Sequence, residues 1–128
     1  MTRILIVDDD PDMAELLGHM CDILGHEHQF VQTGAEAIEI CRQRSPDAIV
    51  LDVMLEETDG WEIYRQLEPV TQAPIIFITA WRTGENRQKA EALLADGFLA
   101  KPISHQDFAH QLQKVMGFPA RRLRQSAA

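Results

Sequence analysis

The fold of this chain is decided by the stretch Ile4–Pro11, which reads ILIVDDDP. Four apolar residues followed by carboxylates are typical of a buried parallel strand that ends at the carboxyl edge of a sheet, where open α/β folds place their ligands. A second apolar run, 48–51, ends in the same way at Asp52. The two runs predict that three carboxylates, those of Asp8, Asp9 and Asp52, converge at one edge.

Carboxylates that lie this close repel one another unless a cation joins them. Mg²⁺ is the hard divalent ion that takes oxygen ligands and keeps a place for phosphate. We therefore interpret this edge first as a metal-dependent phosphoryl site. Asp10 is set apart from it, because an Asp directly before Pro11 is typical of a helix N-cap.

Strand-like and helix-like patterns alternate five times along the chain. A five-fold βα alternation requires right-handed crossovers and a parallel sheet covered on both faces. The predicted fold class is α/β, a (βα)5 doubly wound three-layer sandwich of the flavodoxin-like type with strand order 2-1-3-4-5. The predicted strands are 3–7, a weaker one around 29–32, then 48–51, 75–78 and 98–100.

Short-range signals mark the starts of several predicted helices. Thr33 with Glu36, and Ser104 with Asp107, have the spacing of helix-capping residues. Gly60 predicts a tight backbone turn before the third helix.

Size and composition point to one globular domain. The chain has 128 residues, of which 45% are hydrophobic and 25% charged, as is ordinary for such a domain. No apolar stretch approaches the about 20 residues that span a bilayer, and no signal peptide precedes the first strand. We expect a cytoplasmic protein with no membrane partner. Cys21 and Cys41 are predicted to be buried free thiols.

The charge is unevenly distributed. The net charge is -8, and three arginines in the last eight positions leave 9 basic and 20 acidic side chains in residues 1–120. Because residues 1–120 are strongly acidic, they should repel the phosphates of nucleic acids, which argues against direct nucleic-acid binding. We expect residues 1–118 to form the domain and residues 119–128 to be a short basic tail or linker stub.

Four of the five predicted strands end in polar residues suited to a phosphoryl site, and the chain thereby resembles the receiver domains of two-component response regulators. The resemblance covers about 3–116. Each of its motifs is weak alone, but their order and spacing together are specific. They are ILIVDDDP at 4–11, IVLDVML at 49–55, DG at 59–60, IFITA at 76–80 and FLAKP at 98–102.

The resemblance implies a role for each polar residue at the edge. Asp52 is the implied phosphoacceptor. Asp8 and Asp9 are the implied acidic pair that binds Mg²⁺, together with Asp52 and the backbone carbonyl of Met54. An ionised Asp nucleophile needs this metal, because the incoming phosphoryl group is itself negatively charged.

Four further residues have implied roles in switching. Thr79 is the implied switch hydroxyl, and Lys101 the basic partner of Asp52. Phe98 occupies the position of an aromatic residue that turns inward with the switch. Met54 and Trp81 stand at the two variable positions that tune phosphoryl lifetime, and their bulk predicts slow hydrolysis.

The implied function is a phosphoacceptor signalling switch without a separate substrate. A histidine kinase, a phosphotransfer protein or a small phosphodonor is the expected source of phosphate. The fourth helix, fifth strand and fifth helix are the expected surface for a downstream protein partner, an output domain or a second copy of the chain.

Two alternatives stay open at this point. The same residues fit a Mg²⁺-dependent phosphohydrolase with an Asp nucleophile. They also fit a receiver-like interaction module that is not phosphorylated, because Glu56 stands where the family usually has proline and Glu57 adds a second charge.

Overall fold

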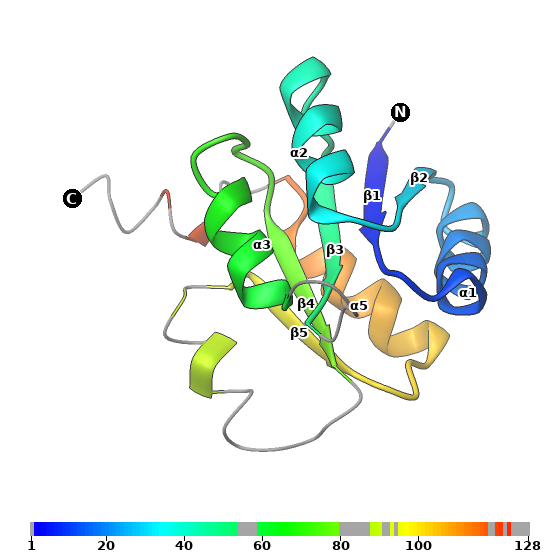
Figure 1. The fold of residues 1–128 in the computed structure, drawn as a ribbon. Coiled ribbons are helices and arrows are strands. Elements are labelled where there is room, and N and C mark those ends of the chain that lie inside the picture. Colours follow the sequence, from blue (N-terminus) through cyan, green and yellow to red (C-terminus); the bar gives the residue numbers. More distant parts are fainter. Residues whose placement is uncertain are drawn as a thin grey trace.

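The computed structural model describes residues 2–53, 59–79, 88–90, 93, 95–117, 120–121 and 123. Five parallel strands form one sheet in the order β2-β1-β3-β4-β5 (Figure 1). The predicted fold class and strand order are therefore confirmed. The strands are β1 Arg3–Val7, β2 Glu27–Val31, β3 Ala48–Asp52, β4 Ile75–Thr79 and β5 Gly97–Ala100.

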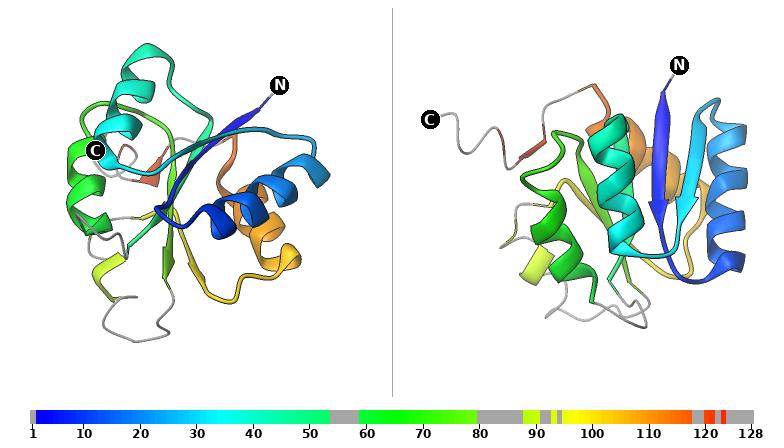
Figure 2. Two further views of the ribbon diagram at one scale, coloured as in Figure 1. Left: turned by 45° about the vertical axis from the view of Figure 1, so that its right-hand side comes forward. Right: turned by 45° about the horizontal axis from the view of Figure 1, so that its top comes forward.

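Helices cover both faces of the sheet. One view in Figure 2 shows the sheet nearly edge-on, with α1 and α5 on one side and α2 and α3 on the other. Residues 88–90 are also helical, and the rest of the predicted fourth helix lies outside the described residues. The bounded helices are α1 Pro11–Ile23, α2 Gly34–Gln43, α3 Gly60–Leu67 and α5 His105–Val115.

The strands β1, β3 and β4 each contribute to two hydrophobic cores, because successive side chains of a strand point to opposite faces. The first core packs the sheet against α1 and α5, and includes Ile4, Ile6, Val50, Ile76, Ile78, Leu17, Phe108 and Leu112. The second packs it against α2 and α3, and includes Leu5, Val7, Ile49, Leu51, Phe77, Ala37, Ile63 and Tyr64. The two cores fix the sheet from both sides and so fix the positions of its carboxyl ends.

The second strand differs from its prediction. β2 begins at Glu27, two residues before the predicted start, and ends at Val31 rather than residue 32. It is an edge strand that pairs only with β1 among the described strands, and all its side chains except Val31 are exposed. An exposed edge strand lacks the apolar alternation on which the prediction depended.

The predicted N-caps are confirmed. Asp10 accepts the N–H of Asp12, and a matching bond begins each of the other three bounded helices. Thr33 and Ser104 cap α2 and α5 as predicted, and Asp59, for which no cap was predicted, caps α3.

Contacts with the domain continue beyond residue 118. Ala120 is fully buried, and the backbone N–H of Arg121 donates to Asp96 Oδ1 over 2.6 Å. The division of the chain at residue 118 stays a prediction. Cys21 and Cys41 are buried free thiols, as predicted. Within the described part of the chain, no helix has the length and apolar character needed to cross a membrane.

Candidate functional site

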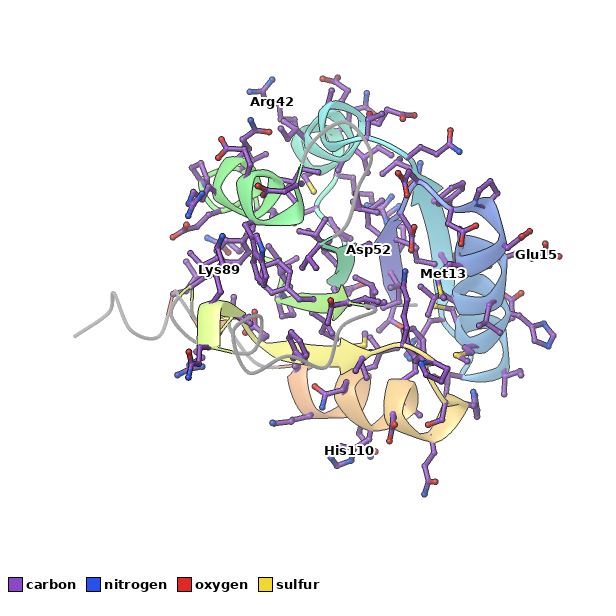
Figure 3. All side chains as sticks on the ribbon, turned by 60° about the horizontal axis from the view of Figure 1, so that its bottom comes forward. Met13, Glu15, Arg42, Asp52, Lys89 and His110 are labelled. Carbon is purple, nitrogen blue, oxygen red and sulfur yellow. The ribbon has the colours of Figure 1, made fainter. Side chains whose placement is uncertain are left out.

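The candidate site lies at the carboxyl ends of the strands, at the bottom of the sheet in Figure 1. Figure 3 looks toward this edge and shows Asp52 near its middle. The strand order explains the convergence, since β1 and β4 are the two neighbours of β3. Asp8, which follows β1, and Thr79, which ends β4, therefore flank Asp52.

Asp52 and Lys101 form a salt bridge at the centre of the site. Lys101 Nζ donates to Asp52 Oδ2 over 2.7 Å. The Asp52 side chain is 2% exposed and that of Lys101 is 21% exposed. Burial by itself lowers the pKa of Lys101, but the hydrogen bond and charge of Asp52, with the charges of Asp8 and Asp10, raise it above its ordinary value overall. The ammonium therefore stays charged beside Asp52 at neutral pH.

Asp8 is the second buried carboxyl group. It is 1% exposed, and its Oδ1 accepts the N–H of Asp10 over 2.9 Å. Burial raises the pKa of Asp8 to about 7, with a further increase from the charge of Asp52, against the lowering effects of the Asp10 N–H and Lys101. Its Oδ2 atom is buried and has no hydrogen-bond partner among the described residues. A buried carboxylate oxygen of this kind is a natural ligand for a hard cation.

The remaining predicted residues lie around this pair. Thr79 is fully buried, and its carbonyl accepts the N–H of Lys101 over 2.7 Å, which holds the two strand ends together. Asp9 is half-buried beside Asp8, and Phe98 is half-buried against the core that contains Phe77. Met54 and Trp81 lie outside the described residues.

The carboxylates are not gathered into a ready-made metal cage. In the described ranges, no group of three or more His, Cys, Asp or Glu side chains is arranged to hold a metal ion. The structure brings Asp8, Asp52 and Lys101 together, whereas Asp9 does not complete a three-carboxylate group with the first two. Mg²⁺ keeps several of its waters and needs only one or two protein carboxylates, so two buried carboxylates still fit it.

Gly60 has a role that its sequence context did not reveal. It does not adopt a positive φ, and the predicted tight turn stays a prediction because residues 54–58 lie outside the described residues. A Cβ atom at Gly60 would lie 2.4 Å from the Asp52 carbonyl oxygen and 2.5 Å from Val53 Cα. The Gly60 N–H donates to the Val53 carbonyl over 3.0 Å. The glycine therefore lets the start of α3 pack directly on the backbone that carries Asp52.

This arrangement agrees with the comparison to known families. Residues 4–113 match the response regulator receiver domain, so the chain belongs to that family. Receiver domains act as phosphoacceptor switches in two-component signalling, and the fold and the family match favour that class over the two alternatives considered above.

Curated relatives and solved structures support the same assignment. The response regulator MprA of Mycobacterium sp. (strain KMS) is 33% identical over 115 residues, which are 89% of this chain and 50% of that protein. The chain thus spans about half the length of the curated relatives that it matches.

Two solved structures are 27% identical to the chain. The chemotaxis protein CheY4 of Vibrio cholerae superposes with a TM-score of 0.81 over 91% of this chain and 99% of that one. The receiver domain of the sensor histidine kinase PA1611 of Pseudomonas aeruginosa PAO1, with a magnesium ion in its active site cleft, has a TM-score of 0.82 and covers 91% of this chain and 98% of its own.

Proposed function

We propose that Asp52 is the phosphoacceptor of a Mg²⁺-dependent aspartyl-phosphate switch. The observation that supports this proposal best is the buried Asp52 carboxylate at the carboxyl end of β3, paired with Lys101 and facing Asp8. The salt bridge with Lys101 holds the Asp52 carboxylate in place, and a carboxylate oxygen is the nucleophile that such a switch needs.

Asp8, Asp9 and Asp52 are the residues that would hold Mg²⁺, with the backbone carbonyl of Met54 as a further proposed ligand. The Oδ2 atom of Asp8 supports this ligand set, because it is buried and has no hydrogen-bond partner among the described residues. When bound, the ion supplies positive charge that offsets the charge of the incoming phosphoryl group. The receiver domain of PA1611 carries magnesium in its own active site cleft, which supports the choice of ion.

In the proposed reaction, an oxygen of the Asp52 carboxylate attacks the phosphorus of the donor. A new O–P bond forms as the bond between phosphorus and the donor breaks, and the donor leaves with its electron pair. Lys101 then pairs with a phosphoryl oxygen instead of with Asp52 alone. Hydrolysis of the acyl phosphate returns Asp52, so this chemistry is confined to the chain itself.

The conformational response starts at Thr79. Its hydroxyl is proposed to donate to a phosphoryl oxygen and to draw the chain after β4 inward, and Phe98 is proposed to turn with it. Met54 and Trp81 keep their proposed role in shielding the acyl phosphate from water.

The proposed phosphate source is a histidine kinase or phosphotransfer protein in the cytoplasm, with small phosphodonors as substitutes. The proposed readout surface consists of the fourth helix, β5 and α5, and it contacts a downstream protein, an output domain or a second copy of the chain. The response regulator family supports these classes of partner.

Intact-mass measurement after incubation with acetyl phosphate and Mg²⁺ tests this proposal. The wild-type protein should gain one phosphoryl group, and Asp52→Asn should gain none. Asp47→Asn is a matched control, because Asp47 is an exposed aspartate at the opposite end of β3. Labelling that persists in Asp52→Asn, or that is lost in Asp47→Asn as well, contradicts the proposal.

A further inference from the structure

An aromatic cluster joins α3 to β4. Trp61 and Tyr64 of α3 pack on Phe77, with ring centroids 4.6 Å and 5.3 Å from the Phe77 ring. Tyr64 and Phe77 are fully buried, and Trp61 is 7% exposed. Phe77 precedes Thr79 by two residues, so both side chains lie on the same face of the strand. The cluster therefore packs on the strand and face that carry the proposed switch hydroxyl.

Two contacts extend from this cluster to the chain that follows β4. The Tyr64 hydroxyl donates to the Leu93 carbonyl over 2.5 Å. The Lys89 Nζ lies 5.3 Å from the centroid of the Trp61 ring, within range of a cation–π interaction. Figure 3 shows Lys89 on the side of its segment that faces α3.

The hydroxyl of Tyr64 supplies a hydrogen-bond donor to the carbonyl group of Leu93. The Leu93 N–H donates to the Lys89 carbonyl, four residues earlier, and the Ala95 N–H to the Ala90 carbonyl, five residues earlier. Carbonyl groups in the last turn of a helix have no partner within the helix. The Leu93 carbonyl receives its donor from Tyr64 instead. A buried acceptor that lost this donor would destabilise the local arrangement.

We propose that Tyr64 is a positioning residue of the switch. Its hydroxyl holds residues 88–90, 93 and 95 against α3 in the unphosphorylated protein and opposes the rearrangement that phosphorylation of Asp52 drives. This inference rests on the proposed function of Asp52. A contact made in only one of two states shifts the equilibrium toward that state by its own free energy. The Lys89 contact with Trp61 acts in the same direction and contributes less, because Lys89 is exposed.

Hydrogen exchange without a phosphodonor tests the contact itself. Tyr64→Phe keeps the ring and removes only the hydroxyl, and the amides of Leu93 and Ala95 should then exchange about fivefold faster. Thr71→Val is the matched control, because it also removes a buried hydroxyl, one that accepts the Ala73 N–H just before β4. Equal exchange at these two amides in both variants overturns the inference.

Phosphorylation kinetics test the link to the switch. With acetyl phosphate and Mg²⁺, Tyr64→Phe should label Asp52 about two- to fivefold faster than wild type, because its segment is already partly released. Thr71→Val should label at the wild-type rate. If Tyr64→Phe also labels at that rate, the inference fails while the proposed function stands. If wild-type Asp52 takes no phosphate, the proposed function fails and the switch role of Tyr64 fails with it.

Discussion

At the amino ends of the strands, Asp47 and Asp96 accept backbone N–H groups, whereas at the carboxyl ends two buried carboxylates, those of Asp8 and Asp52, lie close to each other. Asp47 Oδ2 accepts the N–H of Arg3 over 2.7 Å. Asp96 accepts two N–H groups, that of Ile75 over 2.9 Å and that of Arg121 over 2.6 Å. These carboxylates replace backbone partners that the sheet and helices do not supply, which is a structural role.

The carboxyl ends differ because two aspartate side chains are buried there close to each other. Asp8 and Asp52 are almost fully buried close to each other, and Lys101 forms a salt bridge with Asp52. One oxygen of Asp8 has no partner within the described residues. Two adjacent buried carboxylates reduce the stability of the fold, and such local conflicts are typical of functional sites. The contrast separates the aspartates that stabilise the fold from the aspartates of the proposed phosphoryl site.

The largest change in stability should come from removing the charge of Lys101 at the carboxyl ends. Lys101→Met leaves Asp52 buried without its partner, and the free energy of unfolding at neutral pH should fall by about 3 kcal/mol. The raised pKa of Lys101 means that the folded state holds its proton more tightly than the unfolded state does. The stabilisation is therefore complete at neutral pH and is lost only as the pH rises through the raised pKa. Urea denaturation measures it.

Lys114→Met is the matched control for this prediction, because Lys114 is exposed on α5. Its effect should stay within about 0.5 kcal/mol. Addition of Mg²⁺ should restore part of the loss in Lys101→Met, since a second cation then faces the carboxylates. Equal stability of the two variants would mean that the Lys101–Asp52 pair contributes nothing, and the contrast between the two ends would disappear.

The sequence sufficed to predict the residues that meet at the carboxyl ends. Asp8, Asp52 and Lys101 follow apolar runs whose carboxyl ends lie at one edge of the sheet, with β1 next to β3 and β5 one strand further along. The expected pairing of Lys101 with Asp52 is confirmed. The βα alternation explains the shared edge, because the carboxyl ends of parallel strands lie on one side of the sheet, whereas the pairing of Lys101 with Asp52 came from the family resemblance.

Contacts between distant parts of the chain could not be predicted from the sequence. Tyr64 reads as a core residue of α3, and nothing nearby in sequence indicates that its hydroxyl bonds a carbonyl 29 residues away. Buried tyrosines usually bond their hydroxyl to some partner, but the pattern does not say which. The same holds for Asp96, whose two amide partners come from β4 and from the chain after α5. The close approach of Gly60 to Asp52 is likewise visible only in three dimensions.

A smaller change in the free energy of unfolding is expected from substitution of Asp8, and it should be a gain in stability. Its pKa is raised from 3.8 to about 7. Between these values the folded state keeps a proton that the unfolded state has lost, so the free energy of unfolding falls as the pH rises. Asp8→Asn removes this cost. Without metal, the variant should be more stable than wild type by about 2 kcal/mol at pH 8 and equally stable near pH 4. Thermal and urea denaturation at the two pH values measure the difference.

Magnesium provides the control for Asp8→Asn. Wild type should gain stability on addition of Mg²⁺ at pH 8, and the variant should gain much less, because it has lost a proposed ligand. A variant that is less stable than wild type at pH 8 without metal would place Asp8 in the same structural class as Asp96.

The smallest change in stability is expected at the amino ends, where an aspartate is again replaced by asparagine. Asp96→Asn keeps one carbonyl oxygen for the two N–H groups of Ile75 and Arg121, so one backbone donor loses its charged acceptor. The free energy of unfolding should fall by about 1 kcal/mol, opposite in sign to the change at Asp8. Neither Mg²⁺ nor acetyl phosphate should alter this loss, and Asp52 should be labelled at the wild-type rate, as intact mass can measure. A change of the labelling rate in Asp96→Asn would show that the amino ends also influence the phosphoryl site, and the two sets of aspartates would then not be separable by position alone.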